Sequence, residues 1–306
     1  MSDPAVDFRS ASFSVTQGFF KKRKILITAV SVSIPPGQVF GLVGPNGAGK
    51  TTFIKLGTGL IEPQAGEIMV CGQPVSSAAA KKRIGLLTEK QYCYANMSLN
   101  EWLLLLSGLS GNMGGEIKDR REELLEFFDL SDRISQRMGT LSKGQLQRTG
   151  FVQAFMHNPE IIFLDEPMSG LDPYWRYKVR CFLSELKVKG KTIIFSSHII
   201  SDVEELSDQI GLMVNGTLKW QGAISQLQQA IKGYQVRCRT DNKPALISVA
   251  VKESVDILAD GSYVFTLPSD NRSLLFGLIN AGIIDLESFL PLREKTEELL
   301  FKFKAR

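Results

Sequence analysis

The sequence predicts an α/β protein in which helices cover a parallel sheet, followed by a small α+β domain. Residues 161–164 and 192–195 are apolar throughout, and a helix is expected to begin after Pro173, between them. Strands without polar residues are typical of parallel sheets buried on both faces. Beyond residue 231 the sequence shifts to shorter strand-like and helical segments. We therefore expect one domain over residues 1–230 and a small accessory domain over 231–306.

The first domain begins with residues that favour antiparallel strands. Apolar residues alternate around Phe13 and Val15 and again from Ile25 to Ile34, which predicts short strands closed by a turn at residues 35–37. Further strands are expected at residues 38–43 and 83–87, with a hairpin at 67–70 and 73–75. The helical period predicts helices at residues 51–56, 101–107, 116–130 and 143–157.

The second domain combines both kinds of element. Strands are expected at residues 234–238, 247–251 and 263–267, and helices at 274–280 and 294–302. This mixture predicts the α+β class.

Composition narrows the functional classes. Of the 306 residues 43% are apolar, which is enough for a sizeable core. Lys and Arg outnumber Asp and Glu by 36 to 32, and the net charge of +4 is too small to indicate a nucleic-acid-binding protein. The four cysteines show no C-x-x-C spacing, as is typical of reduced thiols in a cytosolic protein. Because no apolar stretch has the length of a membrane span, we expect no direct membrane insertion.

A glycine-rich segment lies between an expected strand and an expected helix. Its spacing, G-x-x-x-x-G-K-T, predicts a loop that binds phosphate through backbone amides and a helix N-terminus. Lys50 is expected to bridge the β- and γ-phosphates, Thr51 to offer its hydroxyl to Mg²⁺, and Thr52 to steady the α-phosphate. The residues of this segment expected to contact the nucleotide are Gly44, Asn46, Gly47, Ala48, Gly49, Lys50, Thr51 and Thr52.

Two adjacent acids, Asp165 and Glu166, follow the apolar strand at residues 161–164. Successive side chains of a strand point to opposite faces, so the two acids are not expected to serve one ligand atom. Taken alone, the pair could equally mark a strand end that meets water. Beside a phosphate loop, we expect Asp165 to hold Mg²⁺ through a ligand water and Glu166 to polarise the water that attacks the γ-phosphate.

Five motifs occur in order along the chain: GPNGAGKTT, LSKGQLQR, IIFLDEP, SGLD and SSH. Together they resemble the nucleotide-binding subunits of ATP-binding cassette (ABC) transporters, over about residues 10–230. The resemblance implies a P-loop NTPase fold of the ABC ATPase type, with a mixed sheet core, an antiparallel β subdomain and a helical subdomain. ATP and Mg²⁺ are the implied cofactors, and Lys50, Glu166 and His198 the implied catalytic residues.

The resemblance assigns the segment LSKGQ to a contact across a head-to-tail dimer. Ser142, the Gly144 amide and the helix dipole would contact the γ-phosphate of a nucleotide held by the other subunit, and Gln145 is also implied to bind the nucleotide. Ser142 could equally cap an ordinary helix. Lys143 stands where the family commonly has glycine, and it either points outward or adds positive charge near phosphate.

Two further residues receive roles from the resemblance. Asp172 lies in the loop that couples the two sites, and His198 would touch the γ-phosphate and order the attacking water. The other histidine, His157, is expected to be structural.

One position departs from the family pattern. Where a glutamine usually follows the strand at residues 83–87, this chain has Glu89. We expect Glu89 to ligate Mg²⁺; the alternative is that it is an exposed loop acid and that Gln91 takes the role. The resemblance also implies that Phe20 or Phe19 stacks on the adenine ring.

These observations favour the ATPase subunit of a transporter, and the resemblance to drug and sodium efflux subunits implies export. The expected partners are a second copy or a related ATPase subunit, together with separate transmembrane permease subunits, at the cytoplasmic face of the membrane; no nucleic acid is expected. The alternative is a soluble cassette ATPase not coupled to transport. The single cassette, the lack of a long heptad pattern and the modest charge disfavour it.

Overall fold

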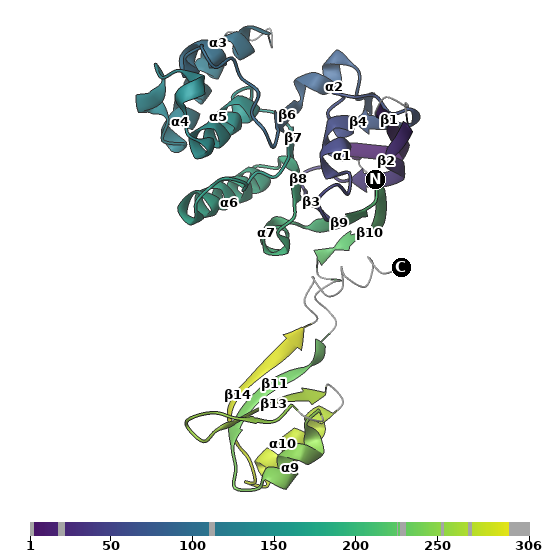
Figure 1. The fold of residues 1–306 in the computed structure, drawn as a ribbon, viewed down its shortest axis with the longest axis vertical. Helices are drawn as coiled ribbons and strands as arrows, with labels where there is room; N and C mark the ends of the chain where they lie inside the picture. Colours follow the sequence, from purple (N-terminus) through teal and green to yellow (C-terminus); the bar gives the residue numbers. More distant parts are fainter. Residues whose placement is uncertain are drawn as a thin grey trace. The chain divides into compact units, whose positions relative to one another are not determined.

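The computed structural model of the chain describes residues 3–17, 22–109, 114–224, 226, 231–251, 254–268 and 271–293. The chain divides into two compact units, Met1–Ala223 and Ile224–Arg306, each with its own apolar core (Figure 1). Among the helices in the described ranges, none is both long and apolar enough to cross a membrane. The assignment of residues 231–306 to an accessory domain stays a prediction.

A six-stranded mixed sheet forms the centre of the first unit. Its strand order is β10-β9-β3-β8-β7-β6, and all neighbours are parallel except β9 and β10. Strands β3, β7 and β8 are buried along their whole length, which confirms the prediction from the unmixed apolar sequences of residues 161–164 and 192–195. The strands are β3 (Val39–Val43), β6 (Ile84–Leu87), β7 (Ile161–Leu164), β8 (Thr192–Ser197), β9 (Gln209–Val214) and β10 (Thr217–Ala223).

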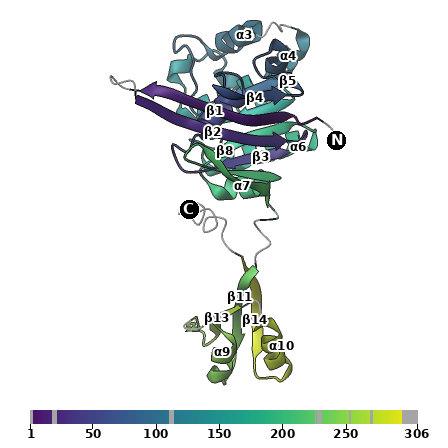
Figure 2. The same cartoon turned by 90° about the vertical axis from the view of Figure 1, so that its right-hand side faces the viewer.

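An antiparallel sheet of order β2-β1-β4-β5 lies beside it (Figure 2). The expectation of short strands at its start was wrong, because β1 and β2 are long and continuous. Three register shifts interrupt their pairing, and Ser10 and Ala29 have positive φ angles of 51° and 44° there. These bulges break the alternation from which strand length was predicted. The strands are β1 (Val6–Gln17), β2 (Lys22–Ile34), β4 (Ala65–Val70) and β5 (Gln73–Pro74), and the predicted hairpin β4–β5 is confirmed.

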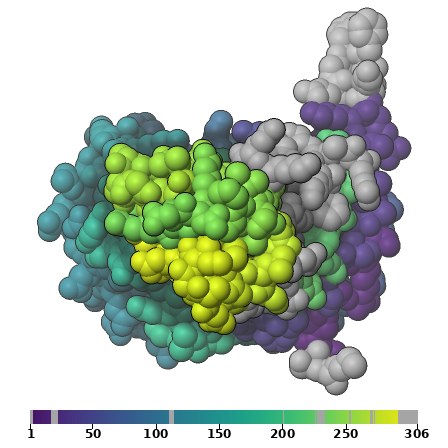
Figure 3. Space-filling view, turned by 90° about the horizontal axis from the view of Figure 1, so that it is seen from below, coloured from purple at the N-terminus to yellow at the C-terminus, as the bar shows by residue number. Residues whose placement is uncertain are grey.

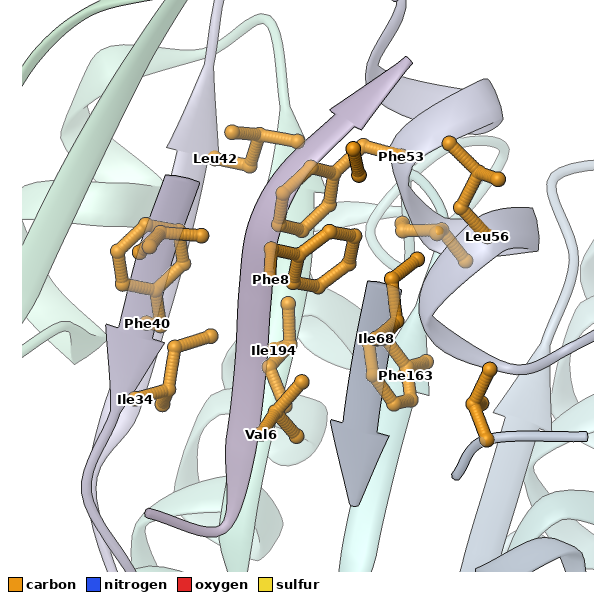
Figure 4. Close-up of a cluster of buried hydrophobic side chains, with 14 of the residues drawn as sticks. Val6, Phe8, Ile34, Phe40, Leu42, Phe53, Leu56, Ile68, Phe163 and Ile194 are labelled. Carbon is orange, nitrogen blue, oxygen red and sulfur yellow. The ribbon is translucent and has the colours of Figure 1, made fainter. Parts of the chain in front are cut away.

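The main core lies between these two sheets and encloses helix α1 (Lys50–Gly57). Phe8 of β1 stacks on Phe53 of α1 with ring centroids 4.2 Å apart (Figure 4). At Gly57 a Cβ would lie 2.6 Å from a ring carbon of Phe163, so the helix approaches β7 closely. Each such buried side chain contributes about 1.5–3 kcal/mol. The helix that begins at the phosphate loop is therefore fixed on two sides.

The other helices of the first unit lie in different places, and only some of them cover the central sheet. Helices α6 and α7 pack on the face opposite α1, where a Cβ at Gly41 would lie 2.3 Å from Val203 of α7 (Figure 1). Helices α3, α4 and α5 form a separate helical group next to β6. The helices are α2 (Ala78–Lys82), α3 (Leu99–Leu109), α4 (Gly115–Phe127), α5 (Lys143–Phe155), α6 (Pro173–Val188) and α7 (Ile200–Leu206), with short 3₁₀ turns at Ser131–Arg133 and Met138–Thr140.

The second unit has the element order β-α-β-β-α-β and an antiparallel sheet of order β12-β13-β11-β14. This is the split βαβ arrangement, in which two helices pack on one sheet. Its elements form one continuous body, green to yellow in Figure 3. They are β11 (Ile231–Arg239), α9 (Lys243–Val249), β12 (Asp256–Ile257), β13 (Tyr263–Pro268), α10 (Arg272–Asn280) and β14 (Asp285–Arg293).

The strand expected at residues 247–251 is wrong, because the segment lies largely in helix α9. The Asn242 side chain caps this helix by accepting from the Ala245 amide, Pro244 lies in its first turn, and Leu246 and Val249 are buried at helical spacing. The helix expected at residues 294–302 lies outside the described residues.

Candidate active site

The glycine-rich loop connects β3 to α1, as expected. A Cβ at Gly44 would lie 2.2 Å from the Met213 carbonyl oxygen of β9, so this glycine allows close packing against the neighbouring strand. Gly47 and Gly49 have φ angles of 79° and 106°, a backbone conformation that favours glycine. A Cβ at Gly49 would also lie 2.8 Å from the Leu26 carbonyl oxygen. Glycine at positions 44, 47 and 49 therefore suits the shape of the loop.

A cavity of about 380 Å³ lies over the loop and the start of α1. It brings together most of the residues expected from the sequence and three others, Lys24, Leu26 and Ser169. No local pattern marks Lys24 and Leu26, because only the tertiary fold places strand β2 beside the loop. The lining residues are Lys24, Leu26, Asn46, Gly47, Ala48, Gly49, Lys50, Thr51, Thr52, Glu89, Glu166, Ser169 and His198. Phe19 and Phe20 lie outside the described residues.

Lys50 is buried at the wall of this cavity, with 6% of its surface exposed. Its Nζ donates a hydrogen bond to the Gly44 carbonyl oxygen at 2.8 Å and lies 3.4 Å from Glu166 Oε1. The ammonium group is therefore held between the loop and one of the two acids. An ammonium group placed in this way can bind a phosphate oxygen by a small movement of its flexible chain.

Glu166 and His198, which both line the cavity, form a close pair. His198 Nδ1 lies 2.7 Å from Glu166 Oε2, although the residues are 32 positions apart. Glu166 has a φ angle of 49°, which is uncommon for a residue with a side chain. Backbone strain of this kind concentrates at active sites, where surrounding contacts hold it in place.

Asp165 lies deeper, with 2% of its surface exposed. Burial raises the pKa of its carboxyl group, hydrogen bonds from the Ser196 and Thr51 hydroxyls oppose that rise, and the negative charges of Glu89 and Glu166 add to it. The reasoning from strand alternation does not apply to the acid pair, since β7 ends at Leu164. Each acid instead has its own partner: the Asp165 carboxylate accepts from the Ser196 hydroxyl at 2.7 Å, and the Glu166 carboxylate lies 3.4 Å from Lys50 Nζ.

Glu89 and Gln91, the two candidates after β6 for a Mg²⁺ ligand, lie in different surroundings. Glu89 is exposed and lines the cavity. The Gln91 side chain lies against Gly150, and its Nε2 donates to the Thr88 carbonyl oxygen at 2.7 Å. Of the two alternatives left by the sequence, the structure therefore brings Glu89 to the cavity.

The segment LSKGQ lies outside the cavity lining of its own chain. Ser142 caps α5, and its side chain and that of Gln145 bond to each other's backbone amides in a capping box. A Cβ at Gly144 would lie 3.5 Å from the Gly170 carbonyl oxygen, and the Lys143 side chain runs along Gly170. The start of α5 therefore packs against the SGLD loop.

Asp172 also lies outside the cavity lining and caps α6, accepting from the Trp175 amide at 2.9 Å. Sequence reasoning did not predict the role of Gln147, whose Nε2 donates to the Pro167 carbonyl oxygen at 3.0 Å. This buried bond joins helix α5 to the loop that follows the acid pair. The outlying His157 contacts the Ile84 carbonyl oxygen, and burial lowers its pKa.

Comparison with known proteins gives the family. The family described as ABC transporter matches residues 27–169. An ABC transporter ATP-binding protein of Nostoc is 42% identical over 72% of this chain and 67% of its own length. The ABC transporter ATP-binding protein YxlF of Bacillus subtilis is 32% identical over 88% of this chain and 90% of its own length. The chain belongs to the family of ABC transporter ATP-binding proteins. As a member of this family it is an ATPase.

Other ABC transporter ATP-binding proteins agree with this assignment. The Nod factor export ATP-binding protein I of Burkholderia thailandensis is 34% identical over 70% of this chain and 71% of its own length. A solved ATP-binding subunit of an ABC transporter is 29% identical, with a TM-score of 0.65 over 73% of this chain and 91% of that chain. A dimeric ATP-binding cassette bound to ADP and Pi is 22% identical, with a TM-score of 0.66 over 72% of this chain and 98% of that chain. These structures confirm the fold class predicted from the sequence.

Proposed function

We propose that the protein hydrolyses ATP with Glu166 as the general base and powers export through separate transmembrane permease subunits at the cytoplasmic face of the membrane. The observation that supports this most directly is the cavity in which Lys50, Glu166 and His198 face one another beside the phosphate loop. The direction of transport rests on the relatives, one of which is a Nod factor export protein.

Each residue of the proposed site has a chemical role that its position supports. The phosphate loop and the start of α1 bind the triphosphate, and Lys50 exchanges its contact with Glu166 for β- and γ-phosphate oxygens. Glu166 takes the proton of the attacking water. His198 holds the Glu166 carboxylate in place and contacts the γ-phosphate.

The oxygen donors at the site fit Mg²⁺. Thr51, Asp165 and Glu89 would hold it, since Thr51 and Glu89 line the cavity and the Asp165 carboxylate is buried at the end of the neighbouring strand. Phosphate oxygens of the nucleotide are further ligands of the kind that Mg²⁺ prefers. When bound, Mg²⁺ neutralises charge that develops on the phosphates.

Replacing Glu89 with Gln is expected to extend ATPase activity to lower pH. The negative charge of Glu89 contributes to the raised pKa of Asp165, so its removal lowers that pKa and keeps the carboxylate ionised in more acidic solution. The rate of phosphate release across a pH series checks this. Glu62→Gln, at an exposed acid outside the cavity lining, is the matched control. Identical pH and Mg²⁺ profiles for Glu89→Gln and the parent would exclude Glu89 from the metal site.

We infer that two copies, or this chain and a related subunit, close head to tail over the nucleotides. Ser142, Gly144, Gln145 and Asp172 lie outside the cavity of their own chain, which supports a role at the cavity of the partner. Ser142 is exposed at the N-terminus of α5, where an anion is stabilised by the helix dipole.

Mixing two inactive variants tests this arrangement. Asp is a good N-cap, so Ser142→Asp keeps α5 intact while it repels a phosphate. Lys50→Ala removes the cation from the phosphate loop. In a head-to-tail dimer, each site combines the phosphate loop of one copy with the Ser142 segment of the other. A dimer with one copy of each variant therefore has one site that carries both changes and one site that carries neither. Activity should therefore appear on mixing, and mixtures as inactive as the separate variants would contradict the shared site.

A further inference from the structure

Ser196 lies where the phosphate loop and the two acids meet, and it is fully buried. It is the fifth residue of β8, which pairs with β3 on one side and β7 on the other. The register places Ser196 opposite Leu42 of β3, and Phe195 opposite Leu164, the last residue of β7. Since the strands are parallel, their carboxyl ends share one edge. Ser196 therefore lies level with the end of β3 and one position beyond the last residue of β7, where Asp165 follows.

The face of β8 that carries Ser196 changes from apolar to polar at this point. Ile194 precedes it on the same face and belongs to the main core, near Phe163 (Figure 4). The next side chain on that face is the Ser196 hydroxyl, and it meets the Asp165 carboxylate instead of another apolar group.

The hydroxyl makes two hydrogen bonds, one to each acid residue. Ser196 Oγ donates to Asp165 Oδ1 at 2.7 Å and accepts from the Glu166 backbone amide at 2.9 Å. A serine hydroxyl has one hydrogen to donate and lone pairs to accept, so the two bonds are compatible and together fix its orientation. One side chain thus holds the carboxylate of the first acid and the backbone of the second.

The second bond matters because of the conformation of Glu166. Its φ angle of 49° is sparsely populated by residues with a side chain, and such a conformation persists only where neighbouring contacts hold it. The bond from the Glu166 amide to Ser196 is such a contact. This backbone conformation directs the Glu166 side chain toward Lys50 and His198.

We propose that Ser196 is a positioning residue of the active site, whose hydroxyl holds the Asp165 carboxylate and the Glu166 backbone in the arrangement that binding and hydrolysis of the nucleotide–metal complex require. This inference rests on the proposed roles of Asp165 and Glu166. It adds a residue that neither the phosphate loop nor the acid pair contains.

A purely structural role predicts a different outcome, and the same strand offers a control. Thr192, at the start of β8, is also buried, and its hydroxyl accepts from the Gly37 amide at 2.9 Å. It contacts neither acid in the described structure. If buried hydroxyls of β8 only stabilise the fold, Ser196→Ala and Thr192→Val should lower the melting temperature and leave the metal dependence of both proteins unchanged.

The experiment compares the full-length parent, Ser196→Ala, Ser196→Cys and Thr192→Val. The affinity for a non-hydrolysable ATP analogue is measured by calorimetry with Mg²⁺ and with EDTA, and kcat is measured with saturating ATP and Mg²⁺. We expect Ser196→Ala to bind the analogue in EDTA as the parent does. The increase in analogue affinity on adding Mg²⁺, or kcat, should be roughly 10–100-fold smaller than in the parent. Changing a residue that orients metal ligands usually reduces metal affinity or activity by such a factor. Thr192→Val should keep both.

Ser196→Cys covers the case in which Ser196→Ala does not fold, because it nearly preserves the volume and offers only a weak donor and acceptor. It should show a smaller loss in the same quantities. Parental kcat and parental Mg²⁺ gain in a folded Ser196 variant would overturn the proposal, as would an equal loss in Thr192→Val. A parent that neither binds nor hydrolyses ATP would instead overturn the proposed function, and Glu166→Gln with parental kcat would overturn the assigned base.

Discussion

Glu166→Gln is expected to slow ATP hydrolysis by about 10²–10⁴-fold, the usual contribution of a general base. The amide of glutamine has the shape of the carboxyl group but cannot take a proton from water. Lys50 and the phosphate loop remain, so ATP should stay bound, and the nucleotide should hold two copies together. Phosphate release measures the rate, and size-exclusion chromatography with ATP and Mg²⁺ measures the dimer.

A matched change at the other end of the same strand serves as the control. Glu160 directly precedes β7, is exposed and pairs with Arg83 at 3.2 Å. Because it lies outside the cavity, Glu160→Gln should hydrolyse ATP at the parental rate. If Glu166→Gln also kept that rate, another group would have to activate the water.

Lys50→Ala is expected to weaken ATP binding by about 10–100-fold, because a hydrogen bond to a charged group contributes about 1.5–3 kcal/mol. The change removes the cation of the phosphate loop. It also leaves the Glu166 carboxylate without its neighbour at 3.4 Å, so negative charge faces the phosphates unopposed. Isothermal titration calorimetry with ATP in the presence of Mg²⁺ measures the affinity.

Lys55→Ala is the control that distinguishes the specific contact of Lys50 with ATP from the general effect of losing one positive charge. Lys55 belongs to the same helix α1 but is exposed and lies outside the cavity lining. It should bind ATP with parental affinity. Equal losses in Lys50→Ala and Lys55→Ala would show that general electrostatic attraction, and not a specific contact of Lys50, accounts for the binding.

Sequence reasoning was most successful where the signal is local. The strand, glycine loop and helix around Lys50 were predicted because their residues are contiguous and their backbone conformations require glycine. It failed where long-range contacts decide the structure. Residues 247–251 have a β-branched, apolar composition, yet the burial of Leu246 and Val249 in the core of the second unit makes most of this segment helical.

The acid pair shows the same limit. From the sequence alone, Asp165 and Glu166 are expected to contact different ligand atoms, because successive side chains of a strand point to opposite faces. The strand ends before them, and the left-handed backbone of Glu166 directs its side chain. Ser196 escaped notice because its hydroxyl reaches both acids from a neighbouring strand, about thirty positions along the chain.

What the sequence by itself determined is the chemistry available: a phosphate loop, two acids, a histidine and a capped helix, each defined by neighbouring residues. What only the tertiary structure decided is which of these groups meet. The parallel order of β3, β8 and β7 brings Lys50, Ser196, Glu166 and His198 to one edge of the sheet, whereas the segment at Ser142 lies outside the cavity. The physical reason is that backbone propensity and capping act over a few residues, while the pairing of strands and the burial of their apolar faces act between residues distant in the chain.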